Sequence, residues 1–109
     1  MDIIKSSAEI SSLFSNGQRF NTPYFTLIVL SDEKQHGREG RAAFVAGKKN
    51  GNAVWRNRAK RRLRAVCRAT DGPYFGYDVI FLAKRSIDVP SFKELESACS
   101  KALSKAGIR

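Results

Sequence analysis

The stretch "KKNGNAVWRNRAKRRLRAVCR", residues 48–68, decides how this chain folds and which kind of partner it can bind. It contains nine Lys and Arg residues in twenty-one positions, and no Asp or Glu. Placed on a helix at about 100° per residue, its apolar side chains gather within about 120°. The pattern predicts a helix over 53–69, begun by Asn52, with a core side and a cationic side. The core stripe consists of Trp55, Ala59, Leu63, Val66 and Cys67.

The charge of the whole chain is concentrated in this region. The chain has 109 residues and a formal net charge of +10, from 20 basic and 10 acidic side chains. Residues 41–68 hold ten bases and no acid, so the remaining 81 residues are neutral as a group. Like charges three or four positions apart destabilise a free helix, and the phosphates of a bound partner would relieve that repulsion. The asymmetry therefore indicates a polyanion partner, with nucleic acid ahead of an anionic membrane surface.

Other features argue against a membrane or secreted protein. No apolar run approaches the roughly 20 residues that span a bilayer. The start "MDIIKSSAEI" lacks the basic and apolar regions of a signal peptide. Cys67 and Cys99 fall in predicted helices, and we interpret them as reduced core thiols. We therefore expect a cytoplasmic protein with no membrane partner.

The remaining patterns predict a small sheet with helices packed on it. "SSAEISSLFSNG", residues 6–17, has a capping-box pair at Ser6 and Glu9, and Gly17 is placed to end the helix. A second capping box, Ser91 with Glu94, begins a last helix that Gly107 can end. Between them, residues 24–30, 41–47 and 77–83 are rich in β-branched and aromatic side chains and predict strands. The residues indicate one α/β or α+β domain over 1–109.

No catalytic constellation is expected in this chain. His36 is the only histidine, and it lies in the polar stretch 31–40, which we expect to be an exposed connection. Asp71, Asp78 and Asp88 are too irregularly spaced to indicate a site for a hard cation. We therefore expect no catalytic residue and no metal ligand. These residues by themselves indicate a nucleic-acid-binding domain without deciding between RNA and DNA, because a basic helix could equally lie in a DNA major groove.

The segment "GKKNGNAVWRNRAKRRLR", residues 47–64, closely resembles the signature of the bacterial ribonuclease P protein component. In that family a Lys-Lys pair, here residues 48–49, and an Arg-Asn-Arg triplet, here 56–58, lead into a basic helix. "SSLFSNGQRF", "PYFTLIVL" and "YDVIFLAKR" resemble the family's first helix, following strand and last strand. The resemblance implies an α+β fold with about four strands in a mixed sheet and three helices. It also implies the order αβββαβα and an unusual left-handed βαβ crossover.

The resemblance implies a role in removing 5′ leaders from precursor tRNA. In the family the catalyst is a large RNA that works with Mg²⁺, and the protein is its small partner, expected as a monomer in the holoenzyme. The turn and the basic helix contact that RNA. Carried onto this chain, the RNA-binding set is Lys48, Lys49, Asn52, Arg56, Asn57, Arg58, Lys60, Arg61, Arg62, Arg64 and Arg68.

The family also holds the single-stranded leader in a cleft between the sheet and the first helix. The residues carried over to it are Phe14, Phe20, Ile28 and Phe44. Ile10 and Ile28 stand where family members often carry aromatic residues, which implies leader contacts that are either more apolar or weaker. Two alternatives stay open: a general RNA-binding or ribosome-associated protein without a role in cleavage, and a protein-only nuclease.

Overall fold

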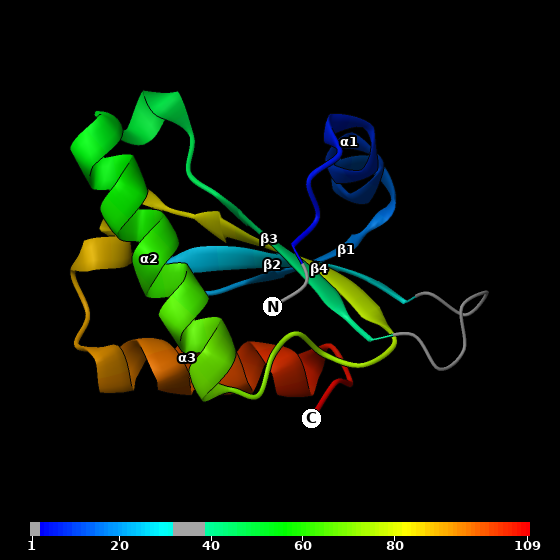
Figure 1. The fold of residues 1–109 in the computed structure, drawn as a ribbon. Coiled ribbons are helices and arrows are strands. Elements are labelled where there is room, and N and C mark those ends of the chain that lie inside the picture. Colours follow the sequence, from blue (N-terminus) through cyan, green and yellow to red (C-terminus); the bar gives the residue numbers. More distant parts are fainter. Residues whose placement is uncertain (1–2, 32–38) are drawn as a thin grey trace.

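The computed structural model describes residues 3–31 and 39–109, and within them the chain forms three α-helices and four strands (Figure 1). The order αβββαβα is confirmed. His36 and most of the expected connection at 31–40 lie outside the described residues. Short 3₁₀ turns, η2 (Lys48–Asn50) and η3 (Arg85–Asp88), precede α2 and α3. The elements are α1 (Ser7–Asn16), β1 (Gln18–Asn21), β2 (Phe25–Ser31), β3 (Arg41–Val45), α2 (Ala53–Ala69), β4 (Tyr77–Ala83) and α3 (Phe92–Lys105).

The four described strands form one mixed sheet in the order β1-β2-β4-β3. β2 pairs antiparallel with both β1 and β4. β3 lies parallel to β4 at the edge, and α2 joins the two, so the chain makes a βαβ crossover around its basic helix. The crossover therefore places α2 beside the edge strand β3.

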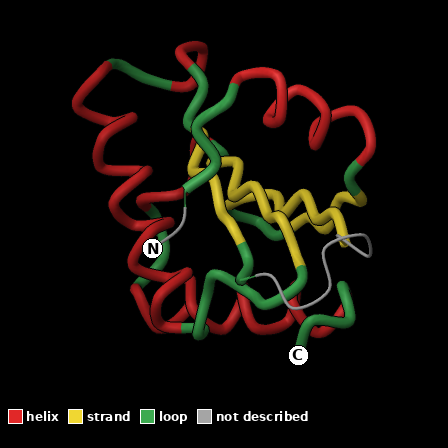
Figure 2. Tube along the Cα trace, turned by 45° about the vertical axis from the view of Figure 1, so that its right-hand side comes forward, coloured by secondary structure: helices red, strands yellow, loops and turns green. Residues whose placement is uncertain are grey.

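Helices cover both faces of the sheet (Figure 2). On one face α2 and α3 pack over a large core that includes Leu27, Phe81, Leu63 and Leu103. On the other face α1 packs over a smaller cluster around Leu13, with Ile28, Ala43 and Ile80 from the strands. Since successive side chains of a strand point to opposite faces, β2, β3 and β4 each contribute to both clusters.

The helix ends follow the expected local chemistry. The Asn52 side chain accepts a 3.0 Å hydrogen bond from the Trp55 N–H, which fixes the start of α2. Ser91 and Glu94 form the reciprocal capping box that was predicted for α3. The Ser6 hydroxyl accepts a hydrogen bond from the Glu9 N–H at 3.4 Å at the start of α1. At its end, the Gly17 N–H donates a hydrogen bond to the Leu13 carbonyl. These side chains satisfy backbone donors that a helix start leaves without partners.

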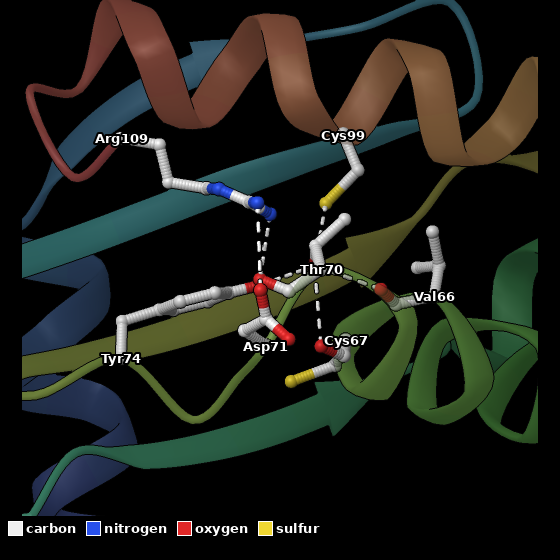
Figure 3. A network of polar contacts seen from close by, with 7 residues as sticks. All are labelled: Val66, Cys67, Thr70, Asp71, Tyr74, Cys99 and Arg109. Carbon is white, nitrogen blue, oxygen red and sulfur yellow. Dashed lines mark hydrogen bonds and ion pairs between the residues drawn. The ribbon is translucent and has the colours of Figure 1, made fainter.

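Thr70, just after α2, anchors that helix to its surroundings through a buried polar network (Figure 3). Its hydroxyl bonds the Val66 carbonyl at 2.8 Å and the Tyr74 hydroxyl at 2.8 Å, and lies 3.7 Å from the Cys99 sulfur. Burial raises the pKa of the Cys67 thiol to about 11, so the thiol stays protonated at neutral pH. Both cysteines are free and buried, as expected from the sequence.

Candidate nucleic-acid interface

The basic helix α2 is held by its apolar stripe. Ala59, Leu63, Val66 and Cys67 are at most 1% exposed and belong to the large core, and the half-buried Trp55 packs against it. The predicted helix over 53–69 and its core stripe are therefore confirmed. With the stripe fixed, the cationic side chains at the other positions must lie on the outer side and at the two edges of α2.

The outer side of α2 is cationic. Arg58, Lys60, Arg61 and Arg68 are exposed. Among the described residues 3–31 and 39–109, no ion pair joins an Arg or Lys of α2 to an acid. An unneutralised surface of this kind attracts phosphates and suits the bidentate geometry of guanidinium groups.

The cations at the edges of α2 contact the protein as well. The Arg64 guanidinium lies over the Phe44 ring of β3, 5.4 Å from its centroid. Arg62 donates a 2.7 Å hydrogen bond from Nη2 to the Pro90 carbonyl, just before α3. Both are half-buried, as is Arg56. These contacts hold α2 against its neighbours, so Arg62 and Arg64 serve the fold in addition to any role in binding.

Lys48 and Lys49 are exposed in η2, immediately before the N-terminus of α2. The N-terminus of a helix carries partial positive charge, and two ammonium groups beside it add to the attraction for an anion. Asn52 is exposed, but its side-chain oxygen accepts from Trp55 and is committed to capping. Asn57 lies exposed on α2. The predicted RNA-binding set therefore forms one continuous region from η2 along α2.

The four side chains predicted for a leader cleft do not lie together. Phe14 and Ile28 belong to the α1 face of the sheet, where Ile28 is fully buried. Phe20 and Phe44 belong with the core under α2 and α3, on the opposite face. The strand register shows the reason: Phe20 and Phe44 share a cross-strand row with Leu27 and Phe81. Assigning all four to one cleft is therefore wrong.

The α1 face carries accessible side chains that the sequence reasoning did not single out. Half-buried Leu82 pairs with Val45 on one side and with Thr26 on the other, and Thr26 pairs in turn with exposed Asn21. The Arg19 guanidinium lies over the half-buried Phe14 ring at 5.6 Å. Strand alternation from Ile28 would have pointed to this row. We call Phe14, Arg19, Asn21, Val45 and Leu82, together with the buried Thr26 that joins their row, the α1-side surface.

Comparison with known proteins identifies the chain. The family model for ribonuclease P matches residues 2–107. This chain belongs to the ribonuclease P protein family. The ribonuclease P protein component of Syntrophomonas wolfei is 31% identical over 106 residues, covering 96% of this chain and 87% of its own. That of Natranaerobius thermophilus is 40% identical over 86 residues, covering 78% and 72%. As a family member, the chain is the protein subunit of a tRNA-processing endoribonuclease.

Solved structures of ribonuclease P proteins share the fold. The Staphylococcus aureus RNase P protein matches with a TM-score of 0.81 at 20% identity, over 99% of this chain and 97% of that one. The Thermotoga maritima protein matches with a TM-score of 0.78 at 19% identity, over 96% and 97%. The mixed four-stranded sheet with three helices expected from the resemblance is thus the family fold. No helix among the described residues is long and apolar enough to cross a membrane.

Proposed function

We propose that this chain uses its two surfaces for two RNAs: the region from η2 along α2 binds the catalytic RNA of ribonuclease P, and the α1-side surface holds the 5′ leader of precursor tRNA. The observation that carries the first assignment is the row of cations on α2 that no acid neutralises among the described residues. Each such cation releases condensed counterions when it meets a phosphate, which favours binding.

The second assignment is supported by the position of the α1-side surface. It combines an aromatic ring under a guanidinium with half-buried aliphatic side chains, a composition suited to unstacked bases and their phosphates. Its row ends at Val45 of β3, three residues before Lys48. A strand of RNA on this surface would therefore approach the lysines that precede α2. In the holoenzyme we expect one copy of the protein.

We further propose that Mg²⁺ acts with the RNA subunit. Within residues 3–31 and 39–109, no cluster of three or more His, Cys, Asp or Glu could hold a metal ion. The protein side chains would bind and orient the RNA, and Mg²⁺ held by the RNA subunit would supply charge neutralisation at the scissile phosphate.

Reconstitution tests the proposed function. The protein is mixed with a bacterial ribonuclease P RNA at low Mg²⁺, and cleavage of a leader-bearing precursor tRNA is followed. We expect the protein to raise the cleavage rate. No stimulation at any Mg²⁺ concentration would remove the proposal, and a general RNA-binding protein would give that result. Cleavage by the protein without the RNA would support a protein-only nuclease instead.

A further inference from the structure

A groove between α2 and α3 combines positive charge with an exposed aromatic ring. It has a volume of about 370 Å³ and is lined by Arg58, Arg61, Arg62, Ala65, Phe92 and Leu95. The four α2 residues lie at positions i, i+3, i+4 and i+7, so they form a single stripe facing α3. Phe92 and Leu95, three apart at the start of α3, form the opposite wall.

The groove has a buried floor and two exposed cations. Leu95 is fully buried, and the hydrogen bond from Arg62 to the Pro90 carbonyl ties α2 to the start of α3. The Arg62 Nε–H is buried with no hydrogen-bond partner among the described residues. Arg58 and Arg61 are exposed. The groove therefore lies between two helices tied together at Arg62 and Pro90, and two guanidinium groups at its rim face solvent.

Phe92 is an unusual residue for its place. It is the first residue of α3 and is 40% exposed, whereas the other apolar side chains that α3 directs to the core are at most 3% exposed. Covering the exposed part of this ring with an apolar or aromatic partner would be favourable. Beside Arg58 and Arg61 the ring can offer its face to a planar group while the guanidinium groups hold an anion.

We propose that this groove binds one unpaired nucleotide of the RNA partner, with its base stacked on Phe92 and its flanking phosphates held by Arg58 and Arg61. The inference rests on the proposed function, since it assigns a nucleotide to the same basic helix. A duplex would offer phosphates to the arginines but no exposed base face to the ring, because its bases are already stacked. An unpaired nucleotide offers both, which matches a ring beside two cations.

Affinity for a bacterial ribonuclease P RNA, measured over a range of monovalent salt, tests the assignment. Phe92→Ala should raise Kd by about 5- to 150-fold, the loss expected for one stacked base. The slope of log Kd against log salt should not change, because no charge is removed. Phe92→Leu, which keeps apolar volume but has no ring, should bind as weakly as the alanine variant, and Phe92→Trp should bind like the parent.

Phe75→Ala is the matched control, since Phe75 is 65% exposed in the loop between α2 and β4, outside the groove. It should keep the parent affinity. Circular dichroism and thermal unfolding establish that each variant is folded. Parent-like affinity of a folded Phe92→Ala or Phe92→Leu variant would overturn the stacked nucleotide and leave the proposed function standing. A parent protein that neither binds nor stimulates the RNA would instead reject the proposed function. If Phe92→Ala altered only the sedimentation mass of the RNA-free protein, the groove would be a contact between copies, and the proposal would fail.

Discussion

Arg41 and Asp78 are joined across the parallel strands β3 and β4 by two side-chain hydrogen bonds, 3.2 Å from Nε and 2.9 Å from Nη2 of the arginine. The same guanidinium forms an ion pair with Glu9 of α1. Hydrogen bonding to Asp78, followed by that to Glu9, raises the pKa of Arg41 above its ordinary value, so the cation persists at any physiological pH. Arg41 therefore ties α1 to the edge of the sheet.

Removing this cation should destabilise the protein. Asp78 is only 7% exposed, and Arg41→Ala would take two charge-assisted hydrogen bonds from it. We expect the free energy of unfolding to fall by about 1.5–3 kcal/mol, the usual contribution of hydrogen bonds to a charged group. Urea unfolding followed by circular dichroism measures the change.

Glu9→Gln provides the control for this network. The Glu9 side chain is 47% exposed, so solvent screens its ion pair, and the loss should be about 0.5 kcal/mol or less. Equal losses in the two variants would show that the bonds between β3 and β4 do not carry the stability assigned to them.

Asn52 belongs to the predicted RNA-binding set, yet its side chain caps α2. Asn52→Ala should lower the free energy of unfolding by about 1 kcal/mol, because the Trp55 N–H loses its acceptor. Asn52→Ser keeps a capping side chain, so its free energy of unfolding should stay within about 0.3 kcal/mol of that of the parent. RNA affinity of the folded serine variant then separates the two roles. Parent-like binding assigns Asn52 to capping alone, and a loss of affinity adds an RNA contact.

The features that sequence predicted well are local ones. The boundaries of α2 follow from an N-cap residue and an apolar stripe at helical spacing, and both lie within one short segment of the sequence. The structure places the helix at Ala53–Ala69. β1 was not located because Gln18–Asn21 is short, mostly exposed and without a β-branched residue. Its strand character comes from pairing with β2, which no local pattern shows.

The prediction of the leader cleft was wrong for a related reason. Alternation tells which side chains of a strand share a face, but the assembled sheet decides which face meets α1. Phe44 and its neighbour Ala43 are both apolar, and only the packing of α1 on Ala43 shows that Phe44 belongs to the other side. The bond from Arg62 to Pro90 likewise joins residues 28 positions apart, beyond any local pattern.

Salt dependence tests the phosphate contacts of the Arg-Asn-Arg triplet. Each contact contributes about 0.7 to 0.9 to the log–log slope, so Arg56→Ala with Arg58→Ala should flatten it by about 1 to 2. The matched control is Lys101→Ala with Lys105→Ala, which removes the same charge from exposed positions of α3 that line a different pocket. Its slope should stay near that of the parent. A parent-like slope and affinity in the arginine pair would mean that neither residue contacts phosphate.

The division of aromatic residues between the two sheet faces leads to a prediction about the leader. Phe14 is half-buried on the α1 face under Arg19, whereas Phe20 is half-buried against the core beneath α2 and α3. Phe14→Ala should therefore weaken holoenzyme binding of leader-bearing precursor tRNA by about 5-fold, the lower end for a lost base contact, with mature tRNA unaffected.

Phe20→Ala should leave the preference for the leader unchanged and instead lower the free energy of unfolding by about 1–2 kcal/mol, since the lost contacts lie in the core. Binding constants for precursors with full-length and trimmed leaders give the comparison. As the leader is shortened, the precursor affinity of the Phe14→Ala holoenzyme should approach that of the parent holoenzyme. The parent then also lacks the leader contact that the variant has lost. If Phe20→Ala lost leader preference while Phe14→Ala kept it, the leader would lie on the opposite face from the one assigned to it.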